Sequence, residues 1–184
     1  MVASVQERLT SQDYRSLPET GQQFQLIEGD LYMAPAPNRL HQDISRNLAL
    51  RISNHLEQQP VGKLYLAPFD VYLDERNVFQ PDLVFIAREN YSVLTDAGVE
   101  GAPDLIVEIL SARTAKLDRT AKKRVYAEAG VKELWLVDPE TRSVAIYDLR
   151  GDPETPLAVH GPSDRFGSPF FPGLLLVVAE LFRQ

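Results

Sequence analysis

The sequence of 184 residues contains no cysteine. Without thiols the chain can form neither a disulfide framework nor a zinc site with thiolate ligands, and this is compatible with a reducing compartment, so we expect a cytoplasmic protein. The longest apolar run, Gly173 to Phe182, is interrupted by Glu180 and is far shorter than the roughly 20 residues that cross a bilayer. We therefore expect no membrane partner. The opening residues, MVASVQERLT, are mixed and polar, which predicts no cleavable signal.

The chain also lacks an excess of positive charge, because 19 lysines and arginines face 26 acidic residues and the net charge is −7. This balance argues against a protein that coats nucleic acid through bulk charge, although a local basic groove or an acidic site neutralised by a divalent cation stays open. Internal repeats, low-complexity tracts and linkers are absent as well. We predict a single domain over residues 1–184, with a core at about 24–150 and a C-terminal extension at 151–184.

Hydrophobic patterning predicts alternating helices and strands. Apolar residues step by four from Leu40 to Leu56, which indicates an amphipathic helix, and Glu-Gly-Asp at the centre of 24–34 indicates a β-hairpin. A second helix, 114–129, is closed by Gly130, and a short one starts at Ser11, a possible cap. Strands are expected at 63–74, 78–87, 104–110, 133–138 and 143–149, with loops at 88–103 and 151–173 and a final strand or helix. This order predicts an α/β (α+β) fold with a mixed central β-sheet flanked by helices.

The segment PDLIVEIL, 103–110, raises a question, because it is apolar enough to be buried yet carries Asp104 and Glu108. A buried carboxylate is costly unless it is paired or holds a metal ion. Residues i and i+4 of a strand share a face but lie about 13 Å apart, so these two cannot ligate one ion. One of them must therefore find its partner on another strand.

The candidate partner comes from the preceding strand, which contains Gln80-Pro81-Asp82. If 78–87 and 104–110 pair antiparallel, Asp82 faces the neighbourhood of Glu108, while Asp104 lies near Ala87 and serves the backbone. Two carboxylates that close repel each other unless a proton or a cation lies between them. The alternative for each is a strand-end cap or an ion pair with a surface arginine.

The helix that follows sorts into stripes at helical spacing. One apolar stripe should face the sheet, and the stripe beside it holds a lysine placed to reach over the sheet edge, with an aspartate one turn earlier to orient it. A helix-surface ion pair is the alternative. The apolar stripe is Leu117, Ala121 and Val125, the bordering stripe is Asp118, Lys122 and Tyr126, and the solvent side is Lys116, Arg119 and Lys123.

Several separated motifs occur in a recognisable order: FQLIEGDLYMAPAP followed by His41, then QPDLVF, GAPDLIVEILS, DRTAKKRVYAEAGVKELWLVDP and PGLLL. On these motifs, which span most of residues 24–176, the chain resembles the Uma2 family, which looks like a branch of the PD-(D/E)XK nuclease superfamily. The resemblance implies a restriction-endonuclease-like core and a metal-dependent endonuclease that hydrolyses DNA. It also implies Mg²⁺, or Mn²⁺, as the cofactor.

By that resemblance, Asp82 and Glu108 hold the metal ion and Lys122 positions water or stabilises charge. The common superfamily pattern has lysine two residues after the glutamate, where this chain has Leu110, so the lysine has moved to the following helix. Glu28 matches a family glutamate that adds a ligand, or else it is a turn carboxylate. Supporting roles fall to Asp118, Tyr126, Asp104 and His41, the last with a cap or packing role as the alternative.

A second hypothesis is a catalytically inactive nuclease-like fold that serves as a binding or assembly module. The leucine at 110 and the acidic charge balance favour it. By analogy with nucleases that cut one strand per subunit, we also expect a homodimer. The apolar segments 133–138, 143–149 and 174–182 are the candidate surfaces for self-association.

Overall fold

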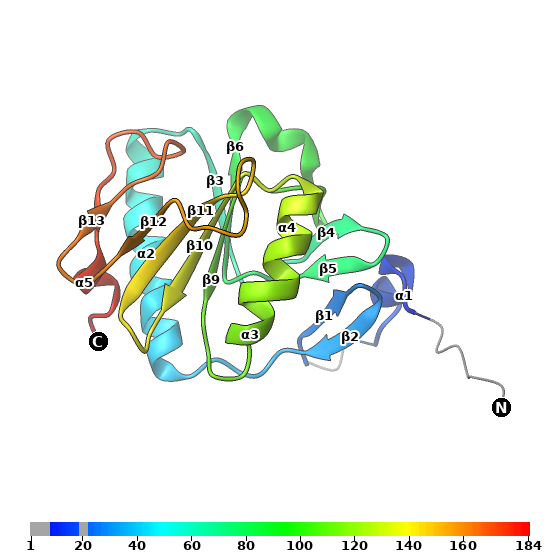
Figure 1. Ribbon diagram of the computed structural model, residues 1–184. Coiled ribbons are helices and arrows are strands. Elements are labelled where there is room, and N and C mark those ends of the chain that lie inside the picture. The colour runs from blue at the N-terminus through cyan, green and yellow to red at the C-terminus, as the bar shows by residue number, and fades with distance from the viewer. Residues whose placement is uncertain (1–7, 19–21) are drawn as a thin grey trace.

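The computed structural model describes residues 8–18 and 22–184, so the expectation for the first seven residues lies outside the described residues. The described chain forms two six-stranded sheets and one two-stranded sheet, with helices packed around them (Figure 1). This is a mixed α/β fold, as predicted, although a second sheet stands beside the central one. No described helix has the length and the apolar character that crossing a bilayer requires.

The main sheet carries most of the core. In it β9 (Leu105–Ile109) and β10 (Glu133–Asp138) run parallel and the other neighbouring strands run antiparallel, so the sheet is mixed. The predicted antiparallel pairing that leads to residues 82 and 108 is confirmed, since Leu83 pairs with Val107 and Phe85 with Leu105. In spatial order the strands are β12 (Ala158–His160), β11 (Ser143–Asp148), β10 (Glu133–Asp138), β9 (Leu105–Ile109), β6 (Leu83–Ala87) and β3 (Gly62–Leu66).

The second sheet contains the predicted hairpin and short strands that the patterns did not resolve. The predicted strands 63–74 and 78–87 are each divided between the two sheets, because Pro68 and Pro81 lack the N–H that continues a ladder and the chain changes direction there. In spatial order the strands are β2 (Asp30–Met33), β1 (Phe24–Ile27), β5 (Asn77–Phe79), β4 (Val71–Asp74), β8 (Gly98–Glu100) and β7 (Leu94–Thr95), with a 3₁₀ helix, η1 (Arg88–Val93), before β7.

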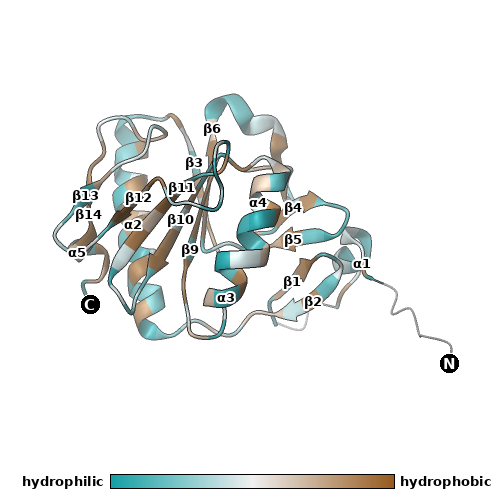
Figure 2. Ribbon diagram, in the orientation of Figure 1, coloured by the Kyte–Doolittle hydropathy of each residue, from teal (hydrophilic) through white to brown (hydrophobic). Residues whose placement is uncertain are grey.

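Helix α2 (Arg39–Gln58) covers one face of the main sheet and confirms the amphipathic pattern. Its buried residues Ile44, Leu48 and Ile52 pack against Phe85 and Val107. Asn38 caps the helix, since its side chain accepts a hydrogen bond from the backbone N–H three residues later. Figure 2 shows apolar (brown) strands between polar outer faces of the helices.

The second predicted helix covers the opposite face, but it is not a regular α-helix. It consists of α3 (Ala115–Leu117), a π-turn, η2 (Asp118–Lys122), and α4 (Lys123–Ala129), and it ends as predicted at Gly130, whose φ is 94°. The π-turn winds more slowly than an α-helix, so residues after it are rotated relative to a regular helix.

This rotation explains one wrong prediction. Lys123 was expected on the solvent side, but it is buried, with its ammonium 3.1 Å from Glu154 and 5.0 Å from the ring centre of Tyr147. The residues Asp118 and Lys122, expected to border the sheet-facing stripe, are themselves fully buried. Lys116 and Arg119 are exposed, as predicted.

The C-terminal segment packs into the main core. Phe166, Phe171 and Leu181 contact the same cluster as α2 and Trp135. Strand β10 lies between β9 and β11 and its apolar residues are buried, so they form the core and not a surface for self-association. The remaining elements are β13 (Arg165–Phe166), β14 (Leu176–Val177), α5 (Val178–Leu181) and α1 (Ser11–Arg15), whose cap is Thr10 and not Ser11.

Candidate active site

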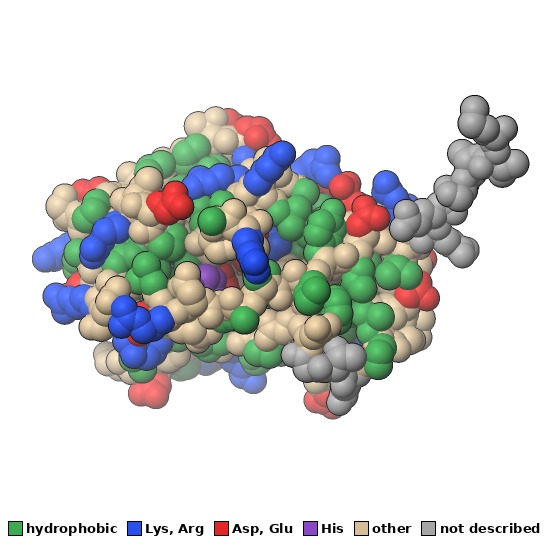
Figure 3. Space-filling model, turned by 90° about the horizontal axis from the view of Figure 1, so that it is seen from below, with side chains coloured by type: hydrophobic (Ala, Val, Ile, Leu, Met, Phe, Trp, Pro, Cys, Tyr) green, Lys and Arg blue, Asp and Glu red, His purple; other side chains and the backbone are tan. Residues whose placement is uncertain are grey.

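A cavity of about 1120 Å³ opens at the end of the main sheet where β9 ends and α2 begins. Loop 34–38 and the first turn of α2 line one side, and the turn after β9 with α3 and η2 lines the other. Figure 3 views the molecule from this end, where a histidine (purple) lies in a hollow with lysine and arginine side chains (blue) above it. The charged lining residues are Asp82, Glu108, Arg113, Lys116, Asp118, Arg119, Lys122, Asp138 and Glu140.

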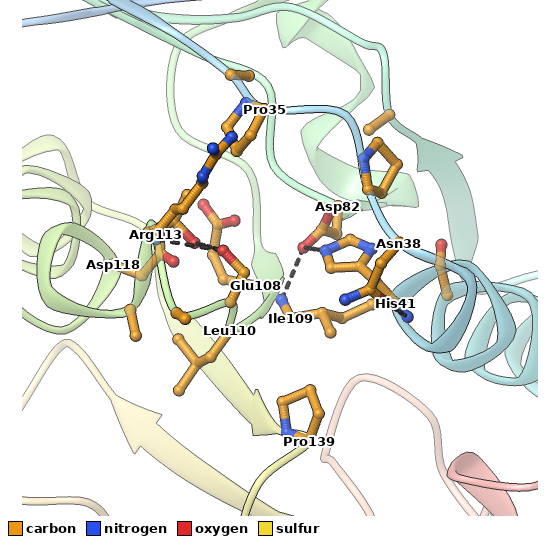
Figure 4. Close-up of a pocket in the computed structure, with 18 of the residues that line it drawn as sticks. Pro35, Asn38, His41, Asp82, Glu108, Ile109, Leu110, Arg113, Asp118 and Pro139 are labelled. Carbon is orange, nitrogen blue, oxygen red and sulfur yellow. Dashed lines mark hydrogen bonds and ion pairs between the residues drawn. The ribbon is translucent and has the colours of Figure 1, made fainter.

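Asp82 and Glu108 come together across neighbouring strands. Because Leu83 pairs with Val107, the register places residue 82 opposite residue 108. Alternation along β9 turns Val107 and Ile109 toward α2 and Glu108 toward the opposite face. The carboxylate of Asp82 also binds the β9 backbone, since its Oδ2 accepts a hydrogen bond from the N–H of Ile109 at 2.7 Å. Both carboxylates line the cavity, and Figure 4 shows Glu108 between Asp118 and Asp82.

Glu108 is held by two donors from the helix above it. Its Oε1 accepts hydrogen bonds from the Lys122 ammonium at 3.0 Å and from the Tyr126 hydroxyl at 2.6 Å. The Lys122 ammonium also lies 3.0 Å from Oδ1 of Asp118. These contacts confirm that Lys122 reaches over the sheet with Asp118 beside it, and they place one ammonium between two carboxylates in a site where the Glu108 and Lys122 side chains are only 5% and 3% exposed.

Burial decides the protonation behaviour of this group. It raises the pKa of Glu108 to about 7, and the charges of Asp118 and Asp82 act in the same direction, while Lys122 and Tyr126 oppose the shift. Burial lowers the pKa of Lys122, but Glu108 and Asp118 outweigh it and hold that pKa above its usual range. Burial and Glu108 raise the pKa of Tyr126. At neutral pH, Lys122 is therefore an ammonium and Tyr126 a neutral phenol.

His41 joins the site from the first turn of α2. Its Nε2 lies 3.2 Å from Oδ2 of Asp82, and its backbone N–H is the group that Asn38 caps. Burial lowers the pKa of His41, but the hydrogen bond and charge of Asp82, with the charge of Glu108, raise the pKa above its ordinary value. The side chain thus fixes the orientation of Asp82, a contact beyond the cap or packing role considered from the sequence.

Asp104 and Glu28 lie apart from this group. Asp104 is fully buried at the other end of β9, where it accepts a hydrogen bond from the N–H of Ala87 at 2.7 Å and pairs with Lys132 at 2.6 Å. This confirms its predicted place near Ala87 and its service to the backbone. Glu28 lies in the β1–β2 turn, half exposed, 2.7 Å from Arg124, and it does not line the cavity.

Comparison with known proteins assigns the chain. Its sequence matches the model of Uma2, described as "Putative restriction endonuclease", over residues 11–179. The chain belongs to the Uma2 family. Among solved structures, this Uma2 chain resembles a "putative nuclease belonging to DUF820" from Anabaena variabilis ATCC 29413, with a TM-score of 0.80 and 22% identity over 95% of this chain and 97% of that one. That likeness shows a shared nuclease-like fold. No curated protein matches.

Divalent metal ions are general cofactors of restriction-endonuclease-like proteins, so the fit of one to this Uma2 chain can be tested. Within residues 8–18 and 22–184, no group of three or more histidine or carboxylate side chains could hold a metal ion. Two carboxylates do converge, and Oδ1 of Asp82 and Oε2 of Glu108 have no hydrogen-bond partner among the described residues. Mg²⁺ keeps several waters and commonly binds through one or two carboxylates. The donor set therefore fits Mg²⁺ without Glu28.

Sequence reasoning missed part of the cavity of this Uma2 chain. Gln25 and Gln80 line it, as do Ser111 and Thr114, whose hydroxyls lie 3.0 Å apart in the turn after β9. A signal for the turn was present, because Ser and Thr three residues apart after a strand favour a local turn. For Gln25 the only signal was a polar residue within an otherwise apolar strand.

Proposed function

We propose that this Uma2 chain is a Mg²⁺-dependent endonuclease, also served by Mn²⁺, that hydrolyses DNA phosphodiester bonds in the cavity. Asp82 and Glu108 are the proposed metal ligands. Lys122 is the proposed group that stabilises charge or positions water. The observation that carries the proposal is the convergence of two carboxylates from neighbouring strands, with the Lys122 ammonium beside one of them, in a cavity at the end of the sheet.

A bound Mg²⁺ would supply Lewis acidity toward a phosphate oxygen and make a water more acidic. The chain itself supplies a fixed positive charge. Because Glu108 and Asp118 each lie 3.0 Å from the Lys122 ammonium and raise its pKa, Lys122 stays protonated and offsets negative charge as it develops on the phosphate. For the same reason Lys122 is a poor proton acceptor, so it is not the base.

The position of Lys122 supports the proposal that it takes the role of the lysine that the superfamily pattern places on the strand. Leu110 shares the face of Glu108 but is buried in the apolar cluster beneath α4, with Val125 and Tyr126. Although Leu110 also lines the cavity, a lysine at that position would bury most of its side chain among apolar residues. The helical segment that covers this face carries the Lys122 ammonium to the same carboxylate instead.

His41 and Tyr126 act as positioning residues in this proposal. The imidazole of His41 and the N–H of Ile109 both contact Oδ2 of Asp82, which leaves Oδ1 for a ligand. The hydroxyl of Tyr126 and the ammonium of Lys122 both bind Oε1 of Glu108, which leaves Oε2. Each carboxylate is thereby held in one orientation with one oxygen available.

The test is cleavage of circular and linear DNA, double- and single-stranded, with Mg²⁺ or Mn²⁺. We expect the purified protein to cut at least one form, and Glu108→Gln and Lys122→Met to lose cleavage. Glu57→Gln, an exposed glutamate on α2, is the matched control and should cut as wild type. Cleavage that survives Glu108→Gln, or no cleavage of any form with either ion, defeats the proposal.

One observation favours the alternative, a nuclease-like fold that binds without cutting. The Lys122 ammonium already neutralises Glu108 within the chain, so the carboxylate does not need a metal ion for its charge to be balanced. Isothermal titration with Mn²⁺ separates the two functions. Heat of binding that Asp82→Asn abolishes supports the nuclease, whereas no binding up to millimolar Mn²⁺, with DNA still bound, supports the binding module.

A further inference from the structure

Unpaired polar atoms gather in the cavity. Five buried side-chain atoms have no hydrogen-bond partner among the described residues: Oε1 of Gln25, Nδ1 of His41, Nε2 of His55, Oε1 of Gln80 and Oδ1 of Asp118. Gln25, His41, Gln80 and Asp118 line the cavity, but the Asp118 oxygen is already paired, because it lies 3.0 Å from the Lys122 ammonium. A buried polar atom without a partner costs about 1–3 kcal/mol. The atoms of Gln25, His41 and Gln80 are therefore available to a polar occupant of the cavity.

Two of these atoms are amide carbonyl oxygens on the wall formed by the second sheet. Gln25 lies on β1, opposite Tyr32, and is only 8% exposed. Gln80 directly follows β5, two residues before Asp82. Its Nε2 donates a hydrogen bond to Oδ1 of Asp70 at 2.8 Å. Since a carboxylate only accepts, this bond fixes the amide orientation and leaves Oε1 as the free acceptor.

From this geometry we propose that Gln25 and Gln80 form a nucleobase subsite, in which their carbonyl oxygens accept hydrogen bonds from the amino group of a base next to the scissile phosphate. The inference rests on the proposed function. Because Asp82 lies only two residues after Gln80, a DNA strand bound at the carboxylates of Asp82 and Glu108 also passes the side-chain amides of the two glutamines. Adenine, cytosine and guanine each carry an exocyclic amino group, and thymine carries none. Pro35 and Pro37, in the loop that follows β2, also line the cavity and add apolar surface for the face of the base.

The subsite also selects the form of the substrate. In a duplex, base pairing engages one N–H of the adenine or cytosine amino group and leaves only one for the two amide acceptors. The reactive side chains here are also nearly buried at the floor of the cavity. The cavity, at about 1120 Å³, is only slightly larger than the roughly 300–1,000 Å³ of pockets that enclose a small-molecule ligand, which suits a nucleotide and not a continuous duplex. Extruding a base from a duplex costs a few kcal/mol, and least where the base is already unpaired. The substrate is therefore a single strand or an unpaired end.

The first experiment measures binding, so that it does not depend on cleavage. Fluorescence anisotropy with EDTA compares dye-labelled strands of about twelve nucleotides: oligodeoxyadenylate, oligodeoxycytidylate, oligothymidylate and a duplex. We expect the better amino-bearing strand to bind roughly tenfold more tightly than oligothymidylate, and more tightly than the duplex. Gln25→Met, which keeps the side-chain length and removes the acceptor, should lower this ratio to about twofold or less.

Controls make each outcome decisive. Gln58→Met, an exposed glutamine at the far end of α2, should retain the full preference. If Gln25→Met melts at a lower temperature than wild type, a modified strand replaces the mutation. In that strand unsubstituted purine replaces adenine, so only the amino group is missing, and wild-type binding to the two strands gives the same comparison. Equal binding of purine and adenine strands, or duplex binding as tight as single-strand binding, overturns the subsite.

The two proposals fail in different ways. Base preference without cleavage of any DNA form leaves the subsite supported and the endonuclease refuted. Cleavage that needs Glu108 but treats all bases and duplexes alike supports the endonuclease and refutes the subsite.

Discussion

Tyr126→Phe isolates the contribution of one hydroxyl to the buried carboxylate of Glu108. The hydroxyl donates to Oε1 of Glu108 at 2.6 Å, and both residues are buried. A hydrogen bond to a charged group contributes about 1.5–3 kcal/mol, and one to a neutral group about 0.5–1.5 kcal/mol. With the pKa of Glu108 raised by burial to about 7, the carboxyl is mainly ionised at pH 8 and mainly protonated at pH 6.

The loss should therefore depend on pH. We expect Tyr126→Phe to lower the free energy of unfolding by about 2 kcal/mol at pH 8 and about 1 kcal/mol at pH 6. For a chain of this size 1 kcal/mol corresponds to roughly 2–4 °C in Tm. The sign follows from the pKa of Glu108, which the Tyr126 hydroxyl lowers. Without the hydroxyl the pKa of Glu108 rises further, so the stability of Tyr126→Phe falls more steeply than that of wild type as pH rises.

Urea denaturation at both pH values measures the effect. Tyr147→Phe is the matched control, because Tyr147 is buried in the same apolar cluster and its hydroxyl has no hydrogen bond among the described residues. That variant should stay within about 0.5 kcal/mol of wild type at both pH values. An equal loss for Tyr126→Phe at pH 6 and pH 8 would refute the reasoning, since Glu108 would then not change its charge in this range.

Three further predictions concern stability. A carboxyl whose pKa is raised in the fold stabilises the fold below its unfolded-state pKa and loses that contribution as pH rises through about 7, so wild type should lose about 1 kcal/mol of unfolding free energy between pH 6 and pH 8. Glu108→Gln should not show this loss, and urea denaturation across this range measures it. Asp104→Ala should cost about 3 kcal/mol, since it leaves the Ala87 N–H without its acceptor and removes one of the two acceptors of the Asn90 amide, and Mn²⁺ titration should be unchanged. Gly98→Ala should cost about 2 kcal/mol or more in thermal melts, because φ is +140° and a Cβ there would lie 2.3 Å from the Asp70 carbonyl oxygen.

The part of the site built from local pattern and strand pairing was predictable from the sequence. Once 78–87 and 104–110 were paired antiparallel, the neighbourhood of Asp82 and Glu108 followed, and so did the separate place of Asp104 beside Ala87. Helical spacing likewise brought Lys122 and Asp118 together. The strand inferences succeeded because the period of two residues is a property of the backbone itself, and the contact between residues four apart is retained in the π-turn at 118–122.

The rest depends on contacts between distant segments. The burial of Gln25 follows from how the second sheet packs against the main one, which no local pattern encodes. For the division of 78–87 between the two sheets, Pro81 was the local signal, but it did not reveal the second sheet. The contact between His41 and Asp82 joins the start of α2 to the start of β6, so no sequence spacing predicts it. Glu28 forms an ion pair with Arg124 of α4, and the Glu-Gly-Asp turn motif alone does not predict this contact.

The π-turn decides which side chain of the run Ala121-Lys122-Lys123 faces Glu108. An α-helix advances by 100° per residue, and the wider turn falls behind by about one residue over its length. An uninterrupted α-helix from Ala115 would carry the lysine at 122 round to where Lys123 now meets Tyr147, and would present the methyl group of Ala121 to the carboxylate. A substitution that converts this π-turn into a regular α-helical turn would therefore move Lys122 away from Glu108. The cavity would lose its ammonium although every proposed catalytic residue was still present in the sequence.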